Sequence, residues 1–63
     1  MAPPRTLWTR RDADGALITC VLVPAKKTAV VWHRDGEVQG VEEFRRQEEA
    51  EVRAAELRDE VFD

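Results

Sequence analysis

Cys20 and His33 are the only cysteine and the only histidine in the chain, and together they could form a nucleophile–base pair. Such a pair needs the two side chains within hydrogen-bond reach and a third group that orients the base. Cys20 lies in the most apolar run of the chain, where burial raises a thiol pKa and disfavours the reactive thiolate. A tetrahedral zinc site usually draws on several Cys or His ligands. We therefore expect neither a catalytic nor a metal-binding role for Cys20 and His33.

Carboxylates are the most numerous candidates for acid–base chemistry, and most of them gather toward the C-terminal end. They are Glu42, Glu43, Glu48, Glu49, Glu51, Glu56, Asp59, Glu60 and Asp63. General acid–base catalysis needs a carboxylate pair in a cleft, where different environments separate the two pKa values. A single exposed helix supplies no cleft, so we interpret these groups as a solvated helix face supported by i,i+4 pairs such as Glu49 with Arg53. We predict that the protein is not an enzyme and binds no cofactor.

Charge is unevenly distributed along the chain. Residues 1–34 carry six Lys and Arg against two Asp, and residues 35–63 carry four Arg against eleven acids, for a net charge of −3. The basic part, with Trp8 and Trp32 as stacking platforms, suggests nucleic-acid binding as one alternative. The acidic part suggests a second, a DNA-mimic inhibitor that presents helix carboxylates to a basic protein. Because the whole chain is acidic and would be repelled by phosphate, we rank the first alternative below a protein-interaction function. We rank the second below it too, because such carboxylates more often only solvate a helix.

The elements that position these residues are four strands and a helix. Alternation and β-branched residues predict strands at about 5–11, 16–23, 28–34 and 37–44, of which the uncharged run 17–23 is the strongest. Turn signals separate them at residues 12–15, 24–27 and 35–36, and the Asp-Gly pair of the last favours a type I′ hairpin. Residues 1–4 contain two prolines, and we expect them to form a disordered arm.

A helix is predicted at about 45–61, because this stretch lacks Gly and Pro and is rich in Glu, Arg, Ala and Leu. Its start has an alternative, since Glu42 and Glu43 would also suit the positive end of a helix dipole. We favour a fourth strand there, with alternating side chains at Val38, Gly40, Glu42 and Phe44.

Two apolar stripes run along the predicted helix. The stripe expected to pack on the sheet comprises Ala50, Ala54, Leu57 and Val61. The stripe left on the other side comprises Val52, Ala55 and Phe62. The strand 17–23 is apolar on both faces, and one helix covers only one face of a small sheet. Something else must then cover the second face, and in a chain this short we expect another chain.

A length of 63 residues allows a single domain, at 5–63, with a small core. We predict the α+β class, with a three- or four-stranded antiparallel β-meander followed by one C-terminal helix packed on the sheet. No apolar run approaches the roughly 18 residues of a membrane span, and we recognise no signal peptide. We therefore expect a cytoplasmic protein without a membrane partner.

The predicted function is that of a small interaction module, such as an adaptor, inhibitor or regulatory factor, which self-associates as a homo-oligomer or binds another protein. The residues expected to contact the partner are Trp32, Val52, Ala55 and Phe62.

Overall fold

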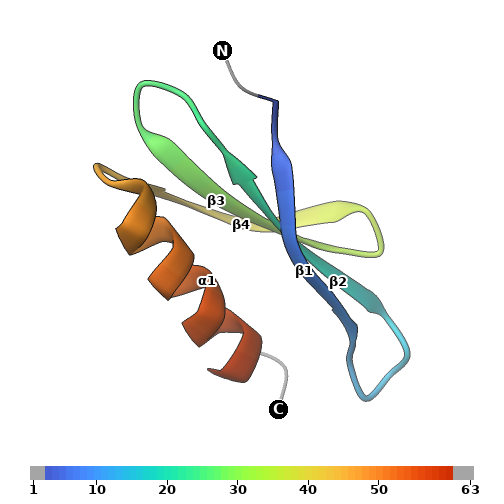
Figure 1. The fold of residues 1–63 in the computed structure, drawn as a ribbon. Helices are drawn as coiled ribbons and strands as arrows, with labels where there is room; N and C mark the ends of the chain where they lie inside the picture. The colour runs from blue at the N-terminus through green and yellow to red at the C-terminus, as the bar shows by residue number, and fades with distance from the viewer. Residues whose placement is uncertain (1–2, 61–63) are drawn as a thin grey trace.

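The computed structural model describes residues 3–60. Four strands, β1 (Arg5–Arg11), β2 (Leu17–Val23), β3 (Thr28–Arg34) and β4 (Glu37–Phe44), are followed by one helix, α1 (Gln47–Glu60). The strands form an antiparallel sheet in the order β1-β2-β3-β4, and α1 lies across one face of it (Figure 1). The predicted α+β meander with a C-terminal helix is confirmed. Because β4 continues to Phe44, the helix starts after the strand, as favoured above, at Gln47 rather than at residue 45.

Local turn chemistry accounts for the hairpins at one end of the sheet. Asp35 and Gly36 have φ angles of 51° and 86°, the positive values that a type I′ turn requires at both central positions. In the β1–β2 loop, the Asp12 carboxylate accepts hydrogen bonds from the backbone N–H groups of Asp14 and Ala16, at 2.9 and 3.0 Å. The Asp35 carboxylate accepts a further bond from the N–H of Leu17, at 2.9 Å, which connects the two loops.

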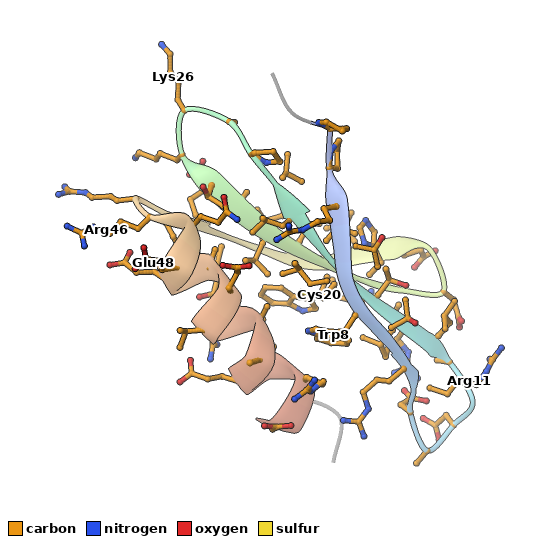
Figure 2. The ribbon with its side chains drawn as sticks, viewed as in Figure 1. Trp8, Arg11, Cys20, Lys26, Arg46 and Glu48 are labelled. Carbon is orange, nitrogen blue, oxygen red and sulfur yellow. The ribbon has the colours of Figure 1, made fainter. Side chains whose placement is uncertain are left out.

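Within the described residues, three side chains of the edge strand β1 make polar contacts with α1. The Trp8 indole Nε1 donates to the Ala54 carbonyl at 2.9 Å, so this indole lies between the sheet and the helix (Figure 2). The Arg10 guanidinium donates to the Arg58 carbonyl at 2.6 Å, in the last turn, where helix carbonyls lack partners and the dipole favours a cation. Near the other end of the helix, Arg5 pairs with Glu51 at 3.1 Å. The order of these contacts shows that β1 and α1 run in the same direction.

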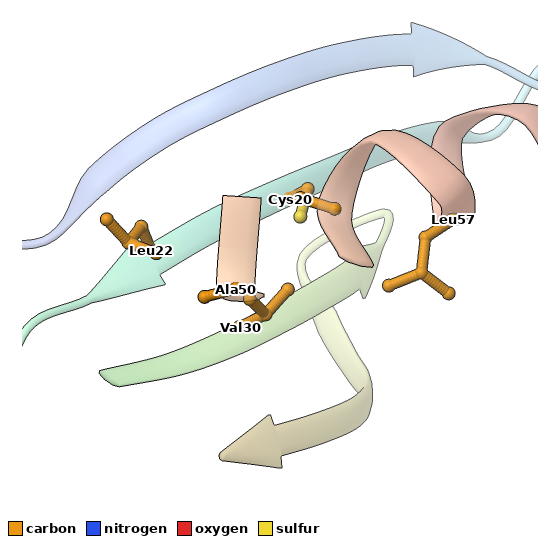
Figure 3. Close-up of a cluster of buried hydrophobic side chains, with 6 residues drawn as sticks. Cys20, Leu22, Val30, Ala50 and Leu57 are labelled. Carbon is orange, nitrogen blue, oxygen red and sulfur yellow. The ribbon is translucent and has the colours of Figure 1, made fainter. Parts of the chain in front are cut away.

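The core lies between the sheet and α1 (Figure 3). Its buried members come from β2, β3 and α1 and are Cys20, Leu22, Val30, Ala50, Ala54 and Leu57. The two alanines let the helix backbone approach the sheet, and Leu57 supplies most of the apolar volume from the helix side. These three helix residues form the stripe that was predicted to face the sheet, and its fourth member, Val61, lies outside the described residues.

Register shifts in both edge strands change which residues share a face. Leu7 is an extra residue between Thr6 and Trp8 in the β1–β2 pairing, and Gln39 is an extra residue in the β3–β4 pairing. A β-bulge of this kind breaks the alternation of side chains between the two faces. Val38 therefore does not share a face with Gly40, Glu42 and Phe44, because it pairs with His33 on the opposite face.

Candidate interaction surface

The sheet has one covered face and one open face. The covered face carries Ile18, Cys20, Leu22 and Val30 and packs against α1. By strand register, the open face carries Thr6, Thr9, Leu17, Thr19, Val21, Val23, Ala29, Val31, His33, Val38 and Val41. Within residues 3–60, no helix or strand packs on the open face (Figure 1).

Exposed apolar side chains are concentrated on the open face. Among the described residues, four large hydrophobic side chains are exposed, and three of them lie here: Leu17 at 40%, Val38 at 58% and Val41 at 54%. Val21, Val31 and Val41 are paired partners on adjacent strands, so they form a continuous row across three strands. This valine row is one apolar band. The next row toward Leu17 runs from Thr9 through Thr19 and His33 to Val38 and is more polar.

Charge is confined to the margin of this face. Arg11 lies at the loop end of the edge strand β1, and Glu43 lies at the opposite end of the other edge strand, β4. Their formal charges cancel, and the valine row between them carries none. An apolar centre with a polar rim is the usual anatomy of a protein–protein interface.

Cys20 and His33 lie on opposite faces of the sheet. Cys20 pairs with Trp32 on the covered face and is completely buried, whereas His33 pairs with Thr19 on the open face. Burial raises the pKa of the Cys20 thiol from 9.0 to about 11, which confirms the expected direction and keeps the thiol neutral. This arrangement does not provide a nucleophile–base pair. In the part of the chain that the structure describes, no three His, Cys, Asp or Glu side chains are grouped as metal ligands.

The polar groups at the loop end of the sheet have structural partners. Arg34 bridges Asp12 and Asp14, and the Asp12 carboxylate also accepts the two backbone bonds of its turn. Burial acts to raise the pKa of Asp12, but these N–H donors and the Arg34 guanidinium outweigh it and hold the pKa below the ordinary value of an aspartate. This cluster therefore holds the β1–β2 loop against β3.

The structure describes three of the four residues expected to contact a partner. Trp32 is half-buried on the covered face and packs against the core, opposite Gly40. Val52 and Ala55 are exposed on α1, and Phe62 lies outside the described residues. Contact with a partner through these side chains stays a prediction.

A shallow depression lies between β4 and α1. It has a volume of about 320 Å³ and is lined by Phe44, Glu48, Glu49, Val52, Arg53 and Glu56. Arg53, one of these lining residues, forms ion pairs with Glu42 of β4 at 3.1 Å and with Glu56 at 3.8 Å. Val52, which was predicted to contact a partner, lines this depression.

The sequence contained a partial signal for the open face. The apolar character of strand 17–23 on both sides indicated an unfilled face, but Val31, Val38 and Val41 were not identified as candidates. The bulge at Gln39 explains the last two, because residues three positions apart share a face only where alternation is broken.

Comparison with protein-family models, with curated proteins and with solved structures gave no match for this chain. No helix within the described residues is both long enough and apolar enough to cross a membrane.

Proposed function

We propose that this chain is a protein-interaction module that works as a homodimer, formed by packing two open faces against each other. The observation that carries the proposal is the concentration of Leu17, Val38 and Val41, all exposed, on a sheet face that α1 does not cover. Burying this face against a second copy removes apolar surface from water in both chains at once.

The size of the face is compatible with a dimer. Four strands spaced about 4.8 Å apart, each about 23 Å long for seven residues, present roughly 440 Å² in projection. Side-chain relief makes the accessible area larger than the projected area. Two such faces therefore approach the roughly 1,200 Å² at which specific interfaces begin.

Charge and shape both suit a second copy. Arg11 and Glu43 leave the face with no net formal charge, so an identical face is not repelled and a strongly charged partner is not attracted. Two identical sheets share the same hand of twist, which allows aligned packing at about −30° with the layers about 10 Å apart. In such a dimer the charges of Arg11 and Glu43 lie at the rim of the interface, where they stay hydrated.

Nucleic-acid binding through the sheet has less support. Trp8 and Trp32, the side chains that would stack on bases, lie on the covered face. Arg5 and Arg10 are engaged by the helix, and Arg34 by Asp12 and Asp14.

Sedimentation equilibrium with two matched variants tests the proposal. Wild-type protein at micromolar concentration should have twice the monomer mass of 7.2 kDa. Val41→Lys places a charge at a 54% exposed position of the open face and should weaken the dimer about tenfold or more. Val52→Lys makes the same change at a 61% exposed position of α1 and should leave the dimer intact. A monomeric wild type with a folded circular dichroism spectrum would refute the proposal, and so would equal weakening by both variants.

A further inference from the structure

The depression between β4 and α1 differs in chemistry from the open face. Its floor is apolar, with half-buried Phe44 from the end of β4 and Val52, which is 61% exposed on α1. Its volume of about 320 Å³ is at the lower end of the roughly 300–1,000 Å³ range of ligand pockets. It is therefore large enough for one anchoring side chain, not for a folded partner surface.

The rim of the depression is acidic. Its lining includes three carboxylates, Glu48, Glu49 and Glu56, and one cation, Arg53. Arg53 is already engaged by Glu56 and by Glu42 from the facing strand. Glu48 and Glu49 form no ion pair within the described part of the chain, and Arg45 and Arg46, which precede α1, do not line the depression. Two carboxylates that form no ion pair with the described residues thus stand beside an apolar hollow.

We infer that this depression binds a basic segment of a partner protein, with an apolar side chain seated on Phe44 and Val52 and flanking Lys or Arg residues beside Glu48 and Glu49. Charge decides the occupant. A second copy would bring three more glutamates against the same rim, and nucleic acid would bring phosphates, so both would be repelled. A basic segment instead gains from the carboxylates, which also speed its approach.

The probe is a capped synthetic pentapeptide, Lys-Arg-Leu-Arg-Lys, titrated into isotope-labelled protein and followed by amide chemical shifts. Two control peptides separate the contribution of the apolar side chain from that of the charges. One has Ser in place of Leu, and the other has Glu in place of each Lys and Arg. We expect saturable shifts around Phe44 and Val52 with the first peptide, about fivefold weaker binding with the Ser peptide, and none with the acidic one.

Two protein variants with the same charge change locate the site. Glu49→Lys alters the rim and should weaken binding of the basic peptide about fivefold. Glu37→Lys, at the other end of β4, changes the net charge equally and should leave the affinity unchanged. Equal weakening by both variants, equal binding of the Leu and Ser peptides, or no saturable shift would each overturn the inference. A change in the mass measured by sedimentation equilibrium for Glu49→Lys would also overturn the inference, because the depression would then take part in self-association.

Discussion

Gly40 lies opposite Trp32 on the covered face, and Gly40→Ala tests how the indole is seated. A Cβ built at Gly40 would lie 2.2, 2.6 and 2.8 Å from the Cζ2, Cε2 and Cη2 atoms of the Trp32 ring. Carbon atoms out of bonding contact prefer separations of about 3.5–4.0 Å, so the ring must move away. It packs against the core beneath α1, and movement there disturbs the neighbouring side chains.

The expected cost follows from two opposing effects. Overpacking of this kind destabilises a protein by about 1–3 kcal/mol. Replacing a strand glycine by alanine recovers about 0.5–1 kcal/mol, because alanine loses less conformational freedom on folding. Gly40→Ala should therefore lower the free energy of unfolding by about 1 kcal/mol, within a range of about 0–2.5 kcal/mol, out of the roughly 5 kcal/mol available to a domain of this size.

A double-mutant cycle separates the clash from other effects. In a Trp32→Leu background the ring is absent, so the same Gly40→Ala change should be neutral or stabilising by about 0.5 kcal/mol. Urea unfolding at one fixed protein concentration measures all four proteins and holds any contribution from dimerisation constant. An equal effect of Gly40→Ala in both backgrounds would show that the indole does not cover this glycine.

The remaining predictions concern the core. Leu57→Ala should cost about 2–4 kcal/mol, because this side chain is 2% exposed, whereas Val52→Ala at a 61% exposed position should change stability by less than about 0.5 kcal/mol. Urea midpoints in the reverse order would mean that α1 is rotated. Above pH 9 the unfolded chain releases the Cys20 proton while the folded chain keeps it up to about pH 11, so stability should fall by up to about 1.4 kcal/mol per pH unit in this window. Cys20→Ala should flatten that slope, and an unchanged slope would contradict the raised pKa.

The secondary structure of this protein follows from local signals. The Asp35-Gly36 pair predicted a type I′ turn because few residues other than Gly, Asn and Asp tolerate positive φ, and both φ angles are positive. The helix face that packs on the sheet was predicted from the spacing of Ala50, Ala54 and Leu57, because helical periodicity is a property of one segment.

Local signals did not predict which residues of the edge strands β1 and β4 share a face of the sheet. Two bulges, at Leu7 and Gln39, shift the alternation, and a bulge is decided by pairing with the neighbouring strand rather than by the bulged strand alone. The close approach of the Trp32 indole to Gly40 is likewise a contact between two strands that the sequence did not indicate.

Amino-acid order was thus sufficient for the fold class, for the order of the elements and for the expectation that one sheet face lacks a cover. It was not sufficient to say which residues remain exposed. Exposure depends on contacts between residues distant in the chain, such as the hydrogen bond from Trp8 to the Ala54 carbonyl, which turns one large aromatic side chain toward α1. Local periodicity does not predict such long-range contacts. Once they form, Leu17, Val38 and Val41 remain exposed on the open face.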